Sequence, residues 1–363
     1  MISSAQPGNA ASLPDRPIRV MIVDDSAFMR FTISNRLSEV PGLTVVGTAR
    51  DGEEALALIP RLQPDVITLD VEMPRLNGLA TLREIMANFP RPVIMLSSLT
   101  SEGASETIQS LTYGAVDFIA KPAAKANIDA VMDELVAKIR KAVKARVFAI
   151  PLARRPVDSS VERPAKPTRT LAAQDKVVVI GSSTGGPRAL NTVVPQLPGD
   201  LSAAVIIVQH MPVGFTRTLA ERLDSVSHLQ VKEAAPGDRL EVGKALVAPG
   251  GFHMVLDANG HIALNQNPPV HGVRPAIDVT LSSVAQKYGS SVVSVILTGM
   301  GSDGTNGSAL VHSNGGVVIA EDEASCVVWG MPRSVVEAGV ADIVSPLADV
   351  AWQIIKAVNN RVG

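Results

Sequence analysis

Two separate groups of polar residues lie directly after short apolar segments of this 363-residue chain. In the C-terminal half these residues are Ser183, His210 and Asp303. A serine becomes a nucleophile when a base takes its proton and an acid orients that base, so these three residue types could hydrolyse an ester or amide. In the N-terminal half the corresponding residues are three carboxylates and a lysine: Asp24, Asp25, Asp70 and Lys121.

The N-terminal group predicts a cation site. Asp24 and Asp25 follow one apolar run and Asp70 follows another, while Ser97 and Lys121 end two more. Three carboxylates in one crevice repel one another unless a divalent cation or a raised pKa relieves them, and oxygen-only ligand sets favour Mg²⁺. A lone aspartate after a strand would more simply cap the next helix, but four such positions in order favour a binding site.

A glycine-rich turn surrounds the candidate nucleophile. The apolar run Lys176–Ile180 leads into Gly181–Pro187, after which a helical pattern begins. As G-x-S-x-G, this turn lifts Ser183 above the sheet edge, where a helix N-terminus stabilises negative charge. The same residues could instead form a phosphate-binding loop, and the motif alone does not decide. His210 and Asp303 at later strand ends favour the hydrolytic interpretation.

Two parallel sheets are needed to bring these residues together, because open parallel sheets gather their ligands at the carboxyl ends of their strands. Short β-branched runs alternate with helical or glycine-rich segments throughout the chain. The expected strands are Ile18–Val23, Leu43–Thr48, Val66–Leu69, Val93–Leu96 and Ala115–Ile119, then Val177–Ile180, Ala204–Val208, Ala245–Ala248, Val292–Leu297 and Val317–Ala320. The prediction is an α/β fold: a five-stranded parallel doubly wound domain followed by a three-layer α/β domain.

The order of the C-terminal residues narrows the second fold. Serine, histidine and aspartate follow one another here, whereas ordinary α/β-hydrolases have the order serine, aspartate, histidine. Triads recur in several orders on unrelated folds, so the difference argues against that fold and leaves the chemistry open. The expected second domain is a three-layer α/β hydrolase domain of Rossmann-like type.

Composition limits the other classes of function. Hydrophobic residues make up 46% of the chain but aromatic residues only 3%, which suits cores of buried parallel strands. The net charge of -2 gives no attraction to nucleic acid, and Cys326 as the single cysteine excludes an internal disulfide. Neither a signal peptide nor a long apolar segment is evident, so we expect a cytoplasmic protein without direct membrane insertion.

A segment rich in proline and arginine separates the two halves. The predicted organisation is a flexible N-terminal tail at residues 1–16, a first domain at 17–144, a linker at 145–174 and a catalytic domain at 175–363.

The first domain resembles the receiver domain of response regulators. Leu69–Pro74 and Asn77-Gly78 carry the likeness, together with the acidic and lysine positions described above. The resemblance implies a phospho-acceptor, Asp70; Mg²⁺ ligands, namely Asp24, Asp25, Asp70 and the backbone carbonyl of Glu72; a phosphoryl-pairing lysine, Lys121; and two switch residues, Ser97 and Phe118. Aspartate is commoner than Asn77 at this turn position, which tolerates both. Phe118 fits an ordinary core aromatic equally well.

The second domain resembles the catalytic domain of the chemotaxis protein-glutamate methylesterases. The matching segments are Gly181–Pro187, Gln209–Pro212, Leu219–Asp224, Ala248–Gly251, Leu297–Gly304 and Ala320–Pro332. By this resemblance Ser183 is the nucleophile, His210 the general base and later acid, and Asp303 the residue that orients His210. The backbone N–H of Met300 would contribute to an oxyanion hole, and Thr184 would lie beside the nucleophile.

The resemblance also implies a function. Methyl esters of glutamate on methyl-accepting chemotaxis receptors would be hydrolysed to release methanol, and receptor glutamines would be deamidated through a similar tetrahedral centre. A chemotaxis histidine kinase would be the phosphodonor, with Mg²⁺ needed for phosphorylation and no cofactor in the hydrolase site. The first domain is expected to occlude the active site until Asp70 is phosphorylated. Two departures, Ser182 where alanine is frequent and Ala276 where serine is frequent, leave the triad intact.

Two further classes of function compete with this hypothesis. A non-enzymatic adaptor would use the second domain only to bind a partner or nucleotide, against which His210 and Asp303 argue. A Rossmann oxidoreductase would bind a dinucleotide at Gly181–Gly186, but G-x-G-x-x-G is lacking and no acidic residue ends the following strand. No metal-ligand spacing appears among the other five histidines, which receive no catalytic role: His228, His253, His261, His271 and His312.

Overall fold

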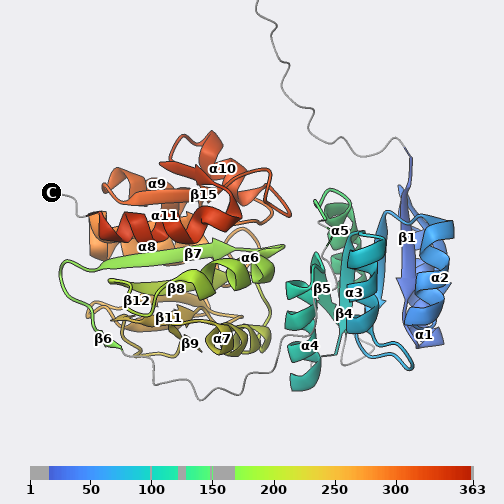
Figure 1. Cartoon of the computed structure of the whole chain (residues 1–363). Helices are drawn as coiled ribbons and strands as arrows, with labels where there is room; N and C mark the ends of the chain where they lie inside the picture. Colours follow the sequence, from blue (N-terminus) through green and yellow to red (C-terminus); the bar gives the residue numbers. More distant parts are fainter. Residues whose placement is uncertain (1–15, 99, 122–127, 148, 150–167, 361–363) are drawn as a thin grey trace, which may run out of the picture.

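The computed structural model describes residues 16–98, 100–121, 128–147, 149 and 168–360. The predicted N-terminal tail, except for Arg16, and most of the predicted linker lie outside these residues. Within them the chain forms two α/β domains, with the first half of the sequence in one and the second half in the other (Figure 1). No helix in the described ranges is both long and apolar enough to span a bilayer.

The N-terminal domain is a five-stranded parallel sheet in the order β2-β1-β3-β4-β5. Its elements are β1 Ile18–Val23, α1 Ala27–Ser38, β2 Leu43–Ala49, α2 Gly52–Leu62, β3 Val66–Asp70, α3 Gly78–Asn88, β4 Val93–Ser97, α4 Ser101–Thr112, β5 Asp117–Ala120 and α5 Ile128–Ala142. The strand order reverses between β1 and β3, which opens a crevice at the carboxyl ends of these strands. Asn77 caps α3 by accepting a hydrogen bond from the N–H of Ala80 at 2.9 Å, which explains why asparagine serves at this turn.

The C-terminal domain is a seven-stranded parallel sheet in the order β16-β15-β14-β7-β8-β11-β9. Its strands are β7 Lys176–Ser182, β8 Ala203–Gln209, β9 Gln230–Glu233, β11 Lys244–Val247, β14 Val292–Ile296, β15 Val317–Glu321 and β16 Ile343–Ser345. Its helices are α6 Gly186–Val193, α7 Phe215–Val226, α8 Ile277–Tyr288, α9 Thr305–Ser313, α10 Met331–Glu337 and α11 Leu347–Asn359. Small antiparallel pairs accompany the sheet: β6 Arg169–Thr170 with β10 Glu241–Val242, and β12 His253–Leu256 with β13 Ile262–Asn265.

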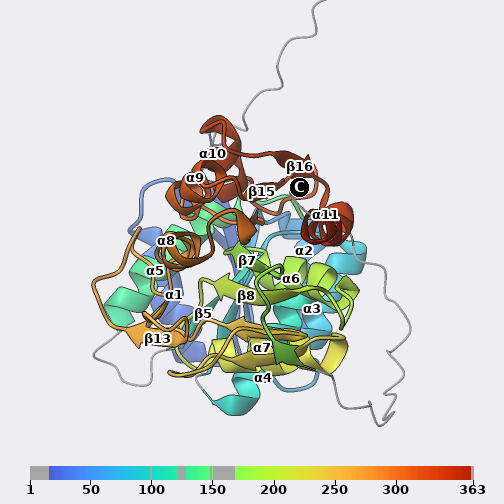
Figure 2. The same cartoon turned by 90° about the vertical axis from the view of Figure 1, so that its left-hand side faces the viewer.

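Alternating strand residues give this sheet two apolar faces. Val178 and Ile180 of β7 pack in one cluster with α6, α7 and α11, whereas Val177 and Val179 pack in another with α8, α9 and α10. Figure 2 shows α8 and α6 on opposite sides of β7 and β8. The predicted three-layer architecture is therefore confirmed. The sheet has two edge strands, β9 and β16, beyond the five that the sequence predicts.

The two domains contact each other through β5 and α4 of the first domain and α6 and α7 of the second (Figure 1). The rings of Phe118 and Phe215 lie 4.4 Å apart at this contact and are tilted by 42°. Both side chains are almost fully buried, and one apolar cluster continues from the first domain into the second. A second connection follows α5, where the N–H of Arg146 donates to the carbonyl of Val327 at 2.9 Å.

Candidate active site

Ser183 lies in a tight turn between β7 and α6. Its N–H donates to the Thr298 carbonyl at 3.1 Å, and its own carbonyl accepts from Gly186 at 2.7 Å. Gly185 has a φ of 79°, and a Cβ at this position would lie 2.7 Å from the Val327 side chain. Glycine is therefore required twice over, by conformation and by space. The predicted strand-turn-helix around the serine is present.

His210 follows the neighbouring strand at the same level. β7 and β8 pair in register up to Ser182 and Gln209, and the His210 N–H donates to the Ser182 carbonyl at 3.2 Å. This register places Ser183 and His210 side by side at the carboxyl edge of the sheet. Among the described residues, no hydrogen bond joins the Ser183 hydroxyl to the His210 ring, and such bonds are often loose before substrate binds.

Asp303 orients the His210 ring. Its Oδ2 lies 2.8 Å from Nε2 of His210, and its two oxygens also accept hydrogen bonds from the N–H groups of Ile277 at 2.7 Å and Asp278 at 2.9 Å. Burial acts to raise the pKa of Asp303, but the hydrogen bond and charge of His210 and the two N–H groups outweigh it and lower the pKa. An ionised carboxylate only accepts, so Nε2 carries the hydrogen and Nδ1 is left as the basic nitrogen.

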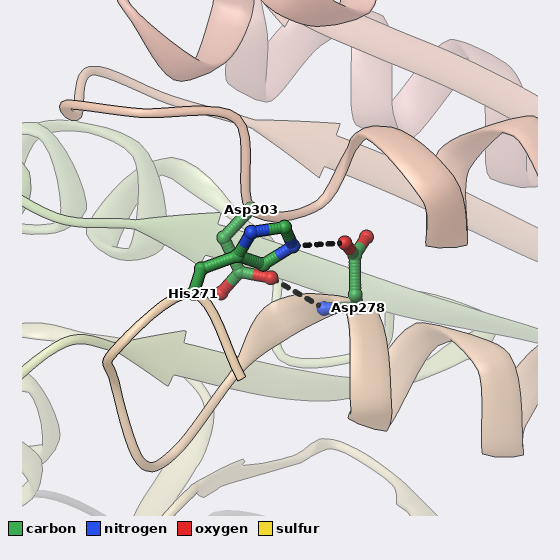
Figure 3. Close-up of side chains that lie close together, drawn as sticks. All are labelled: His271, Asp278 and Asp303. Atoms are coloured by element: carbon green, nitrogen blue, oxygen red, sulfur yellow. Dashed lines mark hydrogen bonds and ion pairs between the residues drawn. The ribbon is translucent and has the colours of Figure 1, made fainter. Parts of the chain in front are cut away.

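A second histidine stands beside this pair. Nε2 of His271 lies 3.0 Å from Oδ2 of Asp278, and the Asp278 N–H donates to Asp303 (Figure 3). Although His271, Asp278 and Asp303 are close enough to hold a cation, their oxygens are already in use. Oδ1 of Asp278 accepts from the N–H of Gly307 at 2.7 Å, and both oxygens of Asp303 have partners. The cluster is a hydrogen-bonded support for the site, and His271 is a pocket residue to which the sequence assigned no role.

The three candidate triad residues line one pocket of about 480 Å³. Thr184, predicted to lie beside the nucleophile, and Met300, predicted to contribute to the oxyanion hole, line it as well. Seven of the 23 residues that line the pocket come from the first domain. The contributed residues are Leu111, Val116, Asp117, Phe118, Glu134, Lys138 and Lys141. The pocket therefore lies between the two domains.

A polar contact at the pocket joins the domains directly. The hydroxyl of Thr184 donates to Oδ2 of Asp117 at 3.1 Å, and Nζ of Lys138 lies 3.1 Å from Oδ1 of the same carboxylate. Lys138 also donates to the carbonyl of Phe118. Asp117 of the first domain thus binds the residue adjacent to Ser183.

A buried carboxyl group stabilises the segment that holds the Ser183 turn. Glu321 is fully buried at the end of β15 and accepts hydrogen bonds from the Thr298 N–H at 2.7 Å and the Ser325 hydroxyl at 3.1 Å. Burial raises its pKa to about 7, although these hydrogen bonds act in the opposite direction. Because the Thr298 carbonyl holds the Ser183 N–H, this carboxyl belongs to the structure that positions the nucleophile.

Replacing Glu321 with glutamine should change the pH dependence of stability. The pKa of Glu321 is about 7 in the folded protein, against an ordinary value of 4.5. Because the folded protein holds this proton more tightly, the protonated carboxyl stabilises the fold fully below pH 4.5, and this stabilisation is lost as the pH rises through 7. A pKa shift of this size corresponds to a change of roughly 3 kcal/mol in the free energy of unfolding. Urea unfolding from pH 5 to 8.5 should show this loss in the wild type and its absence in Glu321→Gln. If the free energy of unfolding depended on pH in the same way in both proteins, Glu321 would not have the raised pKa assigned to it.

The acidic cluster of the first domain lies where the sequence predicts it. Asp24 and Asp70 are buried at the ends of β1 and β3, and Asp25 is exposed beside them. Nζ of Lys121 lies 2.7 Å from Oδ2 of Asp70 and 3.1 Å from Oδ2 of Asp24. Burial raises the pKa of Asp70 to about 6 against the opposing effect of Lys121. Burial acts to lower the pKa of Lys121, but attraction to Asp70 and Asp24 outweighs it and raises the pKa.

These carboxylates fit a divalent cation. Oxygens of Asp24, Asp25 and Asp70 lie within 4.8 Å of one another, close enough to share one ion. Oδ2 of Asp24 is buried, and the Lys121 ammonium lies 3.1 Å from it. Hard oxygen ligands of this kind suit Mg²⁺. The Glu72 carbonyl as a further ligand stays a prediction.

The two predicted switch residues lie on neighbouring strands, Ser97 at the end of β4 and Phe118 within β5. The Ser97 hydroxyl is fully buried and donates to the Gly103 carbonyl at 3.1 Å, so it is directed toward the first turn of α4. Phe118 packs against Phe215 of the other domain, and Nζ of Lys138 lies 5.2 Å from the centre of its ring. Phe118 is therefore an interdomain residue, and its role as a switch stays a prediction.

Fold and sites together define the class of protein: a two-domain response regulator whose second domain is a hydrolase domain built on a parallel α/β sheet. Residues 20–133 match the family model of the response regulator receiver domain, and residues 178–354 match that of CheB methylesterase. The chain belongs to the CheB methylesterase family.

Relatives match along nearly the whole length. A protein-glutamate methylesterase/protein-glutamine glutaminase of Symbiobacterium thermophilum is 53% identical over 94% of this chain and 98% of the relative. One of the same name from Thermotoga maritima is 46% identical over 95% of this chain and 100% of the relative. The crystal structure of the Thermotoga maritima CheB methylesterase catalytic domain covers 51% of this chain and 99% of that domain, with 50% identity and a TM-score of 0.50. The predicted enzyme family is thereby confirmed.

Proposed function

We propose that this chain is a receiver-controlled serine hydrolase that cleaves glutamate γ-methyl esters on methyl-accepting chemotaxis receptors and deamidates receptor glutamines. The names of its relatives support the reaction, and the receiver domain supports the control by phosphorylation. One observation carries the proposal: Ser183, His210 and an oriented Asp303 line the same pocket. We further propose a cytoplasmic location, with a chemotaxis histidine kinase as phosphodonor.

The reaction begins at the Ser183 hydroxyl. His210 Nδ1 takes its proton as Oγ bonds to the γ-carbonyl carbon, and Asp303 stabilises the resulting imidazolium through Nε2. The negative tetrahedral oxygen is held by backbone N–H groups, among which we place that of Met300. The carbon–oxygen bond to the methoxy group then breaks, and that oxygen takes the proton from His210 and leaves as methanol.

A water molecule completes the cycle. His210 takes one proton from the water, whose oxygen bonds to the acyl carbon, and the bond to Ser183 breaks as Oγ regains a proton. The product is the glutamate side chain. Glutamine follows the same course with ammonia as the first leaving group. No cofactor is required in this sequence of steps.

Control is proposed to come from the interdomain contact. In the arrangement described, Asp117, Phe118 and Lys138 of the receiver cover one side of the Ser183 pocket. Phosphorylation of Asp70 would draw Ser97 and Phe118 inward, which removes the Phe118 ring from Phe215 and weakens the contact. Bound Mg²⁺ would neutralise phosphoryl charge during transfer, held by Asp24, Asp25 and Asp70 with the Glu72 carbonyl, while Lys121 pairs with the phosphoryl group.

We place the domain boundaries at residues 17–144 and 175–363, with a tail at 1–16 and a linker at 145–174. The end of α5 at Ala142 and the start of β7 at Lys176 support this division. Arg169 and Thr170 near the end of the proposed linker already pair with β10, so the connection is anchored just before the hydrolase domain.

Asp70→Asn should abolish stimulation by a small phosphodonor. The substitution removes the nucleophilic carboxylate, so neither phosphate incorporation nor faster methanol release from methylated receptor membranes is expected. Chelation of Mg²⁺ should remove the stimulation of the wild type in the same way. Asp129→Asn, an exposed change on α5, serves as the control. If Asp70→Asn is still phosphorylated and stimulated, the acceptor is a different residue.

A further inference from the structure

The side chain of Gln209 connects the strand that carries the nucleophile to the strand that carries the base. Gln209 is the last residue of β8, is 2% exposed and lies in register with Ser182 at the end of β7. Its Nε2 donates to the carbonyl of Ser183 at 3.0 Å and to the carbonyl of His210 at 3.2 Å. One amide group therefore binds the main chain of both catalytic residues.

The orientation of this amide is determined by its partners. Carbonyl oxygens only accept, so the NH₂ group of Gln209 must face the carbonyls of Ser183 and His210. Its Oε1 is then directed at Ser182, whose hydroxyl donates to it at 2.6 Å. Ser182 is fully buried, so no solvent competes for this hydrogen bond.

The backbone leaves space for this amide. A Cβ at Gly186 would lie 2.0 Å from Oε1 of Gln209, closer than atoms can approach. The Gly186 N–H donates to the same Ser183 carbonyl that Gln209 binds, at 2.7 Å. Both lone pairs of that carbonyl therefore accept hydrogen bonds, one from the Gly186 N–H at the start of α6 and one from the Gln209 side chain at the end of β8.

From these contacts we infer that Gln209 is a positioning residue, which sets the distance between the Ser183 hydroxyl and the His210 ring through their main-chain carbonyls. The inference rests on the proposed function, because it concerns the same two catalytic residues. No direct hydrogen bond joins these two side chains in the described structure, so their alignment depends on what holds their backbones. Displacements of about 1 Å in an active site can cost on the order of 100-fold in rate.

Two substitutions test the inference in the full-length protein. Gln209→Met keeps the length of the side chain but removes all three hydrogen bonds, and we expect kcat for methanol release to fall about tenfold with KM within about twofold. Gln209→Glu keeps the shape, but an ionised carboxylate faces two carbonyl oxygens, so the loss should be at least as large. Its activity relative to wild type should rise as the pH falls, because a protonated acid donates one hydrogen bond.

Controls separate positioning from folding and from the proposed function itself. Gln196→Met makes the same change at an exposed glutamine of the hydrolase domain and should leave kcat unchanged. Circular dichroism verifies that each variant is folded, and Ser183→Ala is measured in parallel. An inactive Ser183→Ala with fully active Gln209→Met and Gln209→Glu overturns only this inference, as does a loss confined to KM. A fully active Ser183→Ala would overturn the proposed function instead.

Discussion

Ser183→Ala should lower methanol release from methylated receptor membranes by at least about 10⁴-fold, the scale on which serine hydrolases lose activity when the nucleophile is removed. The two hydroxyls next to it in sequence have other partners: that of Thr184 donates to Asp117, and that of Ser182 donates to Gln209 and is buried. His210 and Asp303 would remain oriented in the variant, but the base would have no hydroxyl to activate. Both the esterase and the deamidase reactions should be lost together, since they share the acyl intermediate.

The matched control is Ser225→Ala, an exposed serine near the end of α7 that bonds only to its own helix. It should retain wild-type activity. If Ser183→Ala instead keeps its activity while folded, the hydrolase mechanism is wrong and a non-enzymatic binding role for the second domain becomes the better hypothesis.

Phe118→Ala should raise the activity of the unphosphorylated enzyme by roughly 10- to 100-fold. The Phe118 ring is 3% exposed, packs 4.4 Å from the Phe215 ring and also contacts the Lys138 ammonium. Loss of this buried aromatic pair should weaken the closed arrangement by about 2 kcal/mol, which shifts the opening equilibrium about 30-fold. Stimulation by a phosphodonor should shrink in the same variant, because much of the enzyme is already open.

Phe31→Ala provides the comparison for this variant. Phe31 is 65% exposed on α1, at the side of the receiver away from the hydrolase domain (Figure 1), so its removal should leave basal activity unchanged. If Phe118→Ala were folded and no more active than wild type, the Phe118–Phe215 contact would not be what limits access to Ser183.

Much of the fold and of both sites could be predicted from the sequence, because their residues stand at the ends of strongly apolar strands. Asp70 ends a fully buried strand and His210 directly follows another, and such strands give a clear signal. The edge strand β16 is only three residues long and half exposed at Val344, so it resembles a loop in sequence. β9 contains two charged residues among four and gives an equally weak signal.

The polar residues that form the interdomain contact could not be predicted in the same way. Asp117 and Lys138 are polar residues at the surface of an ordinary receiver fold, and nothing local distinguishes them from solvated ones. Only the docking of β5 and α4 against the second domain gives Asp117 its partner Thr184. Glu321 was missed for a different reason: as the last residue of a buried strand it could as well have been a cap, and its partners Thr298 and Ser325 come from other segments.

The most direct test of the central claim is the rate at which an organophosphonate labels Ser183, followed by mass spectrometry of the peptide that contains it, with and without a small phosphodonor and Mg²⁺. A receiver-gated serine nucleophile predicts a single adduct on Ser183 that forms several times faster when Asp70 is phosphorylated. An adduct on another residue would contradict the assigned nucleophile, and a labelling rate that phosphorylation leaves unchanged would contradict the gate.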